Sequence, residues 1–170
     1  YPEYVKSLAE FGWLKVSVTD GSNPRLLFER YGFGNDQAQM DTGIRDRYEI
    51  SLYASAPMQP KIKQVSVTPL KNKVSLFLSA TDFDVLDHSY HLSTQIQISK
   101  DPFFEHIVYD HTVNNENWYF GKNKNKDLNL EKLQFTFKSL KSASYVRVRY
   151  RSSEMIWTSW SLPYTLNKSV

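Results

Sequence analysis

The segment from Lys132 to Leu166 constrains the fold more than any other stretch of the sequence. It contains two runs in which residue types alternate, 132–137 and 145–151, followed by a hairpin-like turn between Arg151 and Glu154. Side chains two residues apart point to the same face of a β-strand, so such runs predict strands with one buried face. The segment therefore predicts the closing strands of a β-sandwich, and it contains no obvious catalytic group.

The composition is that of an ordinary globular protein. The chain has 170 residues, of which 41% are hydrophobic and 15% aromatic, with 6 glycines and 7 prolines. These values exclude collagen-like and disordered chains, and the length leaves room for one large or two small domains. The formal net charge is only +3, from 21 basic and 18 acidic side chains spread along the chain. We therefore expect no nucleic-acid partner.

The absence of cysteine removes several kinds of site. Disulfides, zinc–thiolate centres and cysteine nucleophiles are all excluded. No apolar run approaches the roughly 18 residues that a membrane helix needs, so no membrane span is expected. The chain opens on Tyr1 rather than methionine and has no signal peptide, which we interpret as a mature or excised fragment of a longer protein.

Residues 1–55 predict a small β-unit. Residues 1–10, with Pro2 suited to a first helical turn, predict a short helix. Strands are expected at 11–18, 25–31 and 45–53, and the turn residues Asp20-Gly21 and Asn23-Pro24 separate the first two. So thin a unit is marginally stable alone, and we expect it to pack against something else.

Residues 61–170 predict a larger antiparallel domain. The segment 56–60 contains two prolines and no periodicity, so it is the predicted linker between the two units. Strands are then expected at 64–69, 73–80, 92–99, 105–110, 118–120, 132–137, 145–151 and 161–166. Seven or eight short strands without a confident long helix indicate two packed sheets and an all-β fold class.

Residues 61–166 resemble a fibronectin type III domain. The resemblance rests on the strand and turn at 97–104, on Leu140, on the Val-Arg-Val-Arg run at 146–149 and on Trp160-Ser161. Residues 157–161, Trp-Thr-Ser-Trp-Ser, are also similar to the WSXWS box of cytokine receptors, with threonine replacing one serine. The resemblance implies an immunoglobulin-like β-sandwich. The corner tyrosine of that family falls on Ser144 here, so its hydrogen bond does not carry over.

Residues 11–53 resemble the C-terminal strands of calcineurin-like metallophosphoesterases, including relatives of purple acid phosphatases. The resemblance rests on the aromatic-Gly strand at 11–18, on the hairpin to Phe28 and on Asp-Arg-Tyr-Glu-Ile at 46–50. The long insertion from Gly32 to Gly43 departs from that pattern. The resemblance implies an extracellular or periplasmic enzyme whose metal-binding catalytic domain lies upstream. A severed domain interface should then leave an exposed apolar patch on the strands within 11–53.

Three arginines alternate along the predicted strand 145–151 and share one face. One interpretation is a basic strip that binds an acidic partner. The other is a set of guanidinium groups stacked between tryptophans, with roughly 0.5–2 kcal/mol for each cation–π contact. The Trp-x-x-Trp spacing favours this structural ladder, whose members are Arg147, Arg149, Arg151, Trp157 and Trp160.

One loop gathers residues that could hold an ion. Carboxylates and imidazoles are ligands for calcium or transition metals. No glycine stands where a calcium loop needs its sharp bend, so a solvated loop is the favoured interpretation, and we expect neither a metal nor a cofactor. The weak candidates are Asp82, Asp84, Asp87, His88 and His91.

No motif for catalysis is present, since the sequence contains neither a nucleophile elbow nor a glycine-rich phosphate loop. Aromatic residues of the first unit could form a sugar-binding platform, although packing against another domain is favoured. These residues are Trp13, Tyr31, Phe33 and Tyr53.

The expected function is therefore that of a non-catalytic accessory region of a larger exported metallophosphoesterase-like protein, with its upstream catalytic domain as the main partner and a glycan or another protein as further partners. The alternative is a carbohydrate-binding module of a secreted multidomain protein. A stand-alone enzyme would need a cleft with convergent acids, which the sequence does not indicate.

Overall fold

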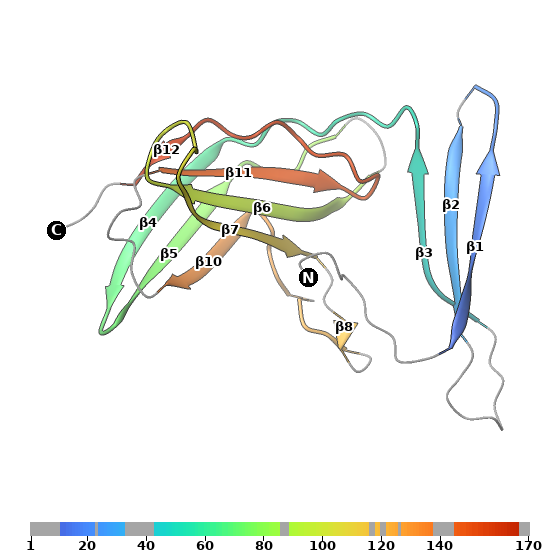
Figure 1. Ribbon diagram of the computed structural model, residues 1–170, viewed down its shortest axis with the longest axis horizontal. Helices are drawn as coiled ribbons and strands as arrows, with labels where there is room; N and C mark the ends of the chain where they lie inside the picture. Colours follow the sequence, from blue (N-terminus) through green and yellow to red (C-terminus); the bar gives the residue numbers. More distant parts are fainter. Residues whose placement is uncertain are drawn as a thin grey trace.

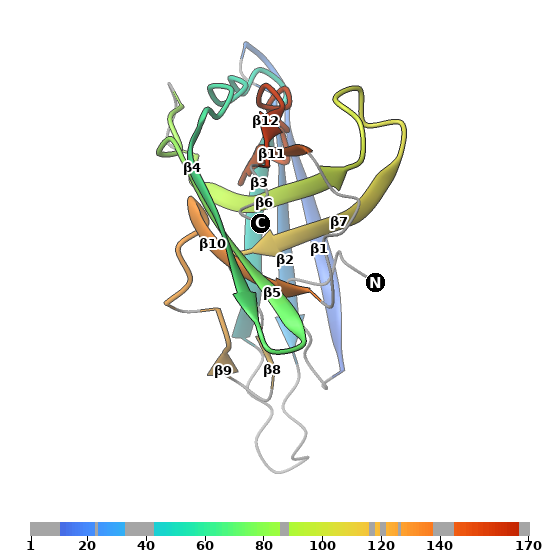
Figure 2. The same cartoon turned by 90° about the vertical axis from the view of Figure 1, so that its left-hand side faces the viewer.

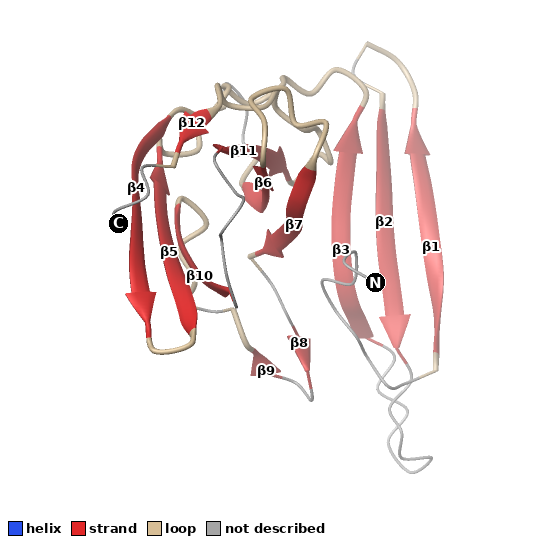
Figure 3. Ribbon diagram, turned by 60° about the vertical axis from the view of Figure 1, so that its left-hand side comes forward, coloured by secondary structure: helices blue, strands red, loops and turns tan. Residues whose placement is uncertain are grey.

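The computed structural model describes residues 11–22, 24–32, 43–85, 89–115, 118–119, 122–125, 127–137 and 145–166. Within these ranges every regular element is a β-strand, and all the pairings are antiparallel (Figure 3). The described part of the chain is therefore all-β. The helix predicted at 1–10 lies outside the described residues, as do Leu140 and Ser144.

The first three strands form a sheet of their own. β1 (Gly12–Thr19), β2 (Arg25–Gly32) and β3 (Gly43–Ser51) are hydrogen-bonded in the order β1-β2-β3. Figure 1 shows this sheet standing beside the rest of the molecule, with β3 nearest to it and β1 at the far edge. Gly21 lies in the turn after β1 with φ of 111°, a conformation that side chains disfavour. We refer to β1–β3 as the small sheet.

Seven of the remaining strands form two sheets that face each other (Figure 2). The first has the order β10-β5-β4, and the second has the order β12-β11-β6-β7. A separate short hairpin pairs β8 (Trp118–Tyr119) with β9 (Lys122–Asn123). The bounds are β4 (Ile62–Leu70), β5 (Lys73–Ala80), β6 (His91–Ser99), β7 (Ile107–Asn114), β10 (Lys132–Phe137), β11 (Tyr145–Ser152) and β12 (Tyr164–Thr165).

The core of this β-sandwich lies between the two sheets. β11 shows the cause most clearly, because every second side chain along it is buried. Apolar side chains of β5, β6 and β10 belong to the same core. Their burial removes apolar surface from water, which stabilises the fold by about 25 cal/mol for each Å². The core consists of Leu76, Leu78, Ala80, Ile96, Ile98, Leu133, Val146, Val148, Tyr150 and Leu166.

Most predicted strands agree with the observed ones to within about two residues at each end, and two differ more in extent. The strand predicted at 105–110 is observed as β7, which runs further, to Asn114, because it pairs with β6 along nearly its whole length. The last strand, predicted at 161–166, is regular only over β12, Tyr164–Thr165. The residues before it follow β11 in an irregular register that is described below with the ladder.

The segment 56–60 joins the two units, but it is packed on the sandwich rather than extended between them. Pro57 and Pro60 are buried, and the Met58 N–H donates to the Asp84 carbonyl at 2.9 Å. The Gln59 side-chain amide donates to the carbonyl of Trp160. Proline rings are apolar and have no N–H to satisfy, so they can be buried at little cost in hydrogen bonds. The predicted linker 56–60 thus lies between the small sheet and the sandwich, and its residues are held on the sandwich.

A side chain of the sandwich contacts the end of the small sheet. The carboxylate of Glu154, in the loop after β11, accepts a hydrogen bond from the N–H of Ser51 at the end of β3. In the next residue, the Leu52 N–H donates to the Pro24 carbonyl at 3.1 Å. The small sheet is thus connected to the sandwich through β3, and β1 lies at the opposite edge.

Candidate functional site

The arginines and tryptophans singled out in the sequence come together on the outer face of the four-stranded sheet. The Arg149 guanidinium carbon lies 4.5 Å from the ring centre of Trp160 and 4.4 Å from that of Trp157. Arg147 stacks in the same way between Trp160, at 4.4 Å, and Phe104, at 4.0 Å. With Arg151 5.3 Å from Trp157, the continuous stack runs Phe104, Arg147, Trp160, Arg149, Trp157, Arg151.

The spacing of the stack follows from a mismatch between two backbones. The N–H groups of Thr158 and Ser161 donate to the carbonyls of Tyr150 and Val148. A step of three residues in the segment 157–161 therefore covers the same length as a step of two residues in β11, as in a β-bulge. The hydroxyls of Thr158 and Ser161 accept the return bonds from the N–H groups of Tyr150 and Val148, both at 3.0 Å. Tryptophans three apart consequently alternate with arginines two apart.

A polar layer holds the arginines from the side of β6. Gln97 accepts hydrogen bonds from two nitrogens of Arg147, at 2.9 and 2.6 Å, and Gln95 accepts one from Arg149 at 2.8 Å. Both glutamine amides donate to the Asp110 carboxylate on β7 at 2.7 Å. Burial lowers the pKa of both arginines, and the Asp110 charge acts in the opposite direction. These internal contacts favour the structural interpretation of the basic strip.

Phe104 extends the stack, and sequence reasoning did not assign it there. It lies in the turn after β6 with φ of 61° and is 6% exposed. The Asp101 carboxylate organises this turn by accepting hydrogen bonds from the N–H groups of Phe103, Glu105 and His106. Partial burial acts to raise the pKa of Asp101, but these hydrogen bonds and one from Ser99 lower it further than burial raises it.

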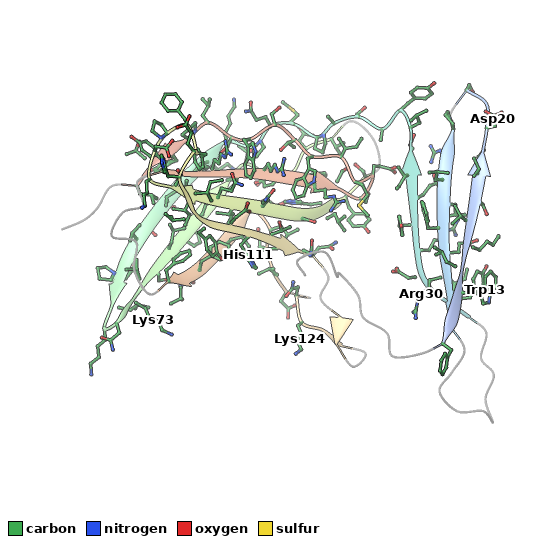
Figure 4. The ribbon with its side chains drawn as sticks, viewed as in Figure 1. Trp13, Asp20, Arg30, Lys73, His111 and Lys124 are labelled. Atoms are coloured by element: carbon green, nitrogen blue, oxygen red, sulfur yellow. The ribbon has the colours of Figure 1, made fainter. Side chains whose placement is uncertain are left out.

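Of the four aromatic residues proposed as a sugar platform, the three that the structure describes are not gathered in one place. Trp13 and Tyr31 are cross-strand partners whose rings stack 4.1 Å apart at 4°. Tyr53 follows β3 at the opposite end of the small sheet, where Ser51 pairs with Arg25. Figure 4 shows Trp13 at one end of this sheet and Asp20 at the other. Phe33 lies outside the described residues.

The candidate metal ligands do not converge where the structure describes them. His91 is largely buried, with Nδ1 2.8 Å from Glu131 and Nε2 2.9 Å from the Thr94 hydroxyl. Burial lowers the pKa of His91, and the Glu131 carboxylate acts in the opposite direction. Asp82 is exposed and lies 3.6 Å from Lys63. No group of three or more such ligands occurs among the described residues, while Asp87 and His88 lie outside them.

One face of the small sheet is apolar and open to solvent. The register places Val16 and Val18 of β1 in line with apolar partners on β2 and β3, while Leu14 at the end of the face is in line with Arg30 and Asp46. Val18 is 74% exposed, Leu14 57% and Leu52, just beyond β3, 73%. Isolated exposed leucines are ordinary, whereas a contiguous apolar patch marks an interaction surface. We call this the apolar face: Leu14, Val16, Val18, Leu26, Phe28, Tyr48, Ile50 and Leu52.

The apolar face contains a hollow near the turn that follows β1. It has a volume of about 250 Å³ and is almost wholly apolar. This size suits one or two side chains of another protein layer better than a drug-sized ligand, whose pockets begin at about 300 Å³. Its walls are Val18, Thr19, Pro24, Arg25, Leu26, Ile50 and Leu52.

The opposite face of the small sheet has the stacked Trp13 and Tyr31 at one end and ion pairs along the rest. The Lys15 ammonium lies 3.0 Å from the Glu29 carboxylate, which is largely buried by its neighbours. The Glu29 hydrogen bond and charge raise the pKa of Lys15. Arg25 forms a second ion pair with Glu49. The two faces therefore differ in the way expected of a sheet that covers a core on one side and meets water on the other.

A comparison of the chain with protein families, with curated proteins and with solved structures finds no match. Within the described ranges, no helix is long and apolar enough to cross a membrane. The site must therefore be interpreted from its own geometry. That geometry contains a structural ladder on the sandwich and an uncovered apolar face on the small sheet.

Proposed function

We propose that this chain is a non-catalytic accessory region of a larger exported metallophosphoesterase-like protein. In this proposal the apolar face of the small sheet packs against the catalytic domain, and the sandwich is a structural or interaction module beside it. The observation that carries the proposal is the apolar face itself, with its polar counterpart around Lys15 and Glu29 on the other side.

The degree of exposure supports a large covering partner. At about 25 cal/mol for each Å² of apolar surface, an uncovered face with several half-exposed large side chains is a substantial driving force for association. The sandwich does not provide the cover, since Leu14, Val16 and Val18 remain about half-exposed or more. A three-stranded sheet is also thin for independent stability and gains from a packed second layer.

The strand order supports a fibronectin type III-like sandwich. The sandwich has seven main strands. In chain order, β4, β5 and β10 are the first, second and fifth and form one sheet, and β6, β7, β11 and β12 are the third, fourth, sixth and seventh and form the other. A constant-type immunoglobulin sandwich differs in one strand: its fourth strand, the equivalent of β7, belongs to the sheet of the first, second and fifth strands. Architectures of this class serve mainly as scaffolds and interaction modules, which fits a non-catalytic role, although fold alone does not define function.

The first prediction concerns activity. The chain is expected to hydrolyse no phosphate ester above background, because no group of metal ligands occurs in the part of the chain that the structure describes. The measurement is turnover of p-nitrophenyl phosphate with zinc, manganese or iron(II) ions supplied in excess. The assay buffer with each metal alone is the control. Turnover that follows the purified chain and disappears with a chelator would contradict the proposal.

Glycan recognition is the alternative, and one observation favours it. Trp13 is 45% exposed although it stacks on Tyr31, so one side of an aromatic pair remains accessible at the end of the small sheet. Tyr53 cannot join this pair, since it follows the other end of β3. Retention on a polysaccharide affinity gel that is lost with Trp13→Ala would favour this alternative over the accessory role.

A further inference from the structure

The outer edge of β1 is a long, regular strand edge. β1 pairs with β2 without interruption over eight positions, from Gly12 to Thr19. It contains no proline, and no hydrogen bond from another described segment covers its outer side. A lysine on an edge strand can discourage pairing with another strand, but the Lys15 ammonium lies 3.0 Å from Glu29 on β2 and is paired within the sheet. Unpaired edges of this kind are templates for an added strand.

The other edges of the main sheets are blunted or short. β4 contains Pro69 and a register shift between Ile62 and Gln64, and β7 pairs with β6 through another shift. The register between β2 and β3 shifts between Arg30 and Tyr31. At the end of β3, the Ser51 N–H is already bonded to the Glu154 carboxylate. β12 is two residues long. β10 is regular but has six residues, and its apolar side chains already face the core. Such devices protect edges from pairing.

We propose that β1 pairs antiparallel with β1 of a second copy of this chain, with Val16 at the two-fold axis. In that register Leu14 lies opposite Val18 of the other copy, and Lys15 lies opposite Ser17. Apolar side chains therefore meet apolar ones on one face, and no like charges are opposed on the other. The strand is self-complementary in this register, as a two-fold interface requires. A register centred on Lys15 would instead oppose two ammonium groups.

The pairing would join two small sheets into one continuous sheet of six strands. The apolar faces of the two copies would lie on the same side, because the register preserves the parity of β1. This arrangement uses the edge of β1 and leaves the apolar face open for a covering layer. It therefore goes beyond the proposed accessory role and does not depend on it.

The test uses the absence of native cysteine. Val16→Cys places two thiols at directly opposed positions, about 4.5–5.5 Å apart between Cα atoms, which is within the range of a disulfide. Under mild oxidation the folded chain should form a disulfide-linked dimer. A mixture of Leu14→Cys and Val18→Cys chains should cross-link more than either variant alone. Ser17→Cys alone should cross-link poorly, since its counterpart lies diagonally, roughly 7–8 Å away.

Leu70→Cys on β4 is the matched control, since Leu70 is 49% exposed and Val16 is 48% exposed. We expect Val16→Cys to cross-link at least about tenfold faster, because pairing raises the effective thiol concentration. Sedimentation of the native chain should show a monomer–dimer equilibrium, which Val16→Lys shifts to monomer while circular dichroism stays unchanged. Equal cross-linking of the Val16, Ser17 and Leu70 variants, or a native chain that is monomeric at its highest soluble concentration, would overturn the proposal.

Discussion

Replacing Tyr150 with alanine is expected to lower the free energy of unfolding by about 3–5 kcal/mol, the usual range for a fully buried aromatic residue. Tyr150 is 1% exposed, and its ring lies 4.3 Å from the His91 imidazole. Its hydroxyl donates a hydrogen bond of 2.6 Å to the Thr81 carbonyl. Removing the side chain leaves a cavity between β11 and the loop before β6, and the carbonyl loses its partner. Urea denaturation followed by tryptophan fluorescence measures the effect.

Tyr150→Phe separates the hydroxyl from the ring. This variant should lose only about 1–2 kcal/mol, because the ring contacts remain and one buried hydrogen bond is removed. Burial raises the pKa of Tyr150 above its ordinary value of about 10. The folded state thus keeps a proton that the unfolded state releases, so native stability should fall as the pH rises above 10. Tyr150→Phe should show a weaker alkaline loss. An identical loss in both proteins would contradict this account.

Replacing Trp160 with alanine is expected to lower the free energy of unfolding by about 2–4 kcal/mol, from lost aromatic burial and two lost cation–π contacts. Trp160 is the only described residue that stacks on both Arg147 and Arg149, at 4.4 and 4.5 Å. Its loss exposes both guanidinium groups on one side and breaks the stack at its centre. The measurement is the shift of the urea midpoint at unchanged slope.

Leu162→Ala provides the matched control for the ladder. Leu162 lies two residues further along the same segment and is 82% exposed, so its removal should change stability by less than about 0.5 kcal/mol. Trp160→Phe retains an aromatic face and should recover part of the loss. Equal stability of the native chain and the Trp160→Ala variant would show that the ladder does not hold the last segment to β11.

Local pattern predicted most of the strands because burial repeats every second residue along them. β11 is the clearest case, since the alternation at 145–151 matches the buried and half-buried positions one by one. The Trp-x-x-Trp and Arg-x-Arg-x-Arg spacings also indicated the ladder. Gly12, which follows the aromatic Phe11, fits a specific need, because a Cβ there would lie 2.1 Å from the Tyr31 carbonyl oxygen.

Features that depend on distant parts of the chain were not predicted. Phe104 joins the stack only because the turn after β6 carries it over Arg147 on β11. The glutamines that hold the arginines come from β6, about fifty positions earlier in the sequence. Tyr53 and Trp13 were grouped by residue type, and antiparallel pairing of the small sheet places them at opposite ends. The prolines of 56–60 indicated a connecting segment, but not that Pro57 and Pro60 would be buried against the sandwich.

For the apolar face, the strands were predicted from the sequence, but whether the sandwich covers them was not. Its residues were recognised as alternating strands, and an exposed patch was expected if a domain interface had been severed. The sequence could not tell whether the sandwich itself would cover that patch. The structure answers this point, because the small sheet meets the sandwich at β3, through Ser51 and Glu154, and leaves the apolar face accessible.

The most direct test of the accessory role is covalent footprinting of the apolar face in two forms of the protein. A carbene label is applied to the isolated chain and to the longer polypeptide that the proposal requires, and mass spectrometry reports the labelling of each residue. Phe103 and Leu162 on the sandwich, 80% and 82% exposed, serve as internal controls. The proposal predicts strong labelling of Leu14, Val18 and Leu52 in the isolated chain and protection in the longer protein. Equal labelling of these residues in both forms would contradict it.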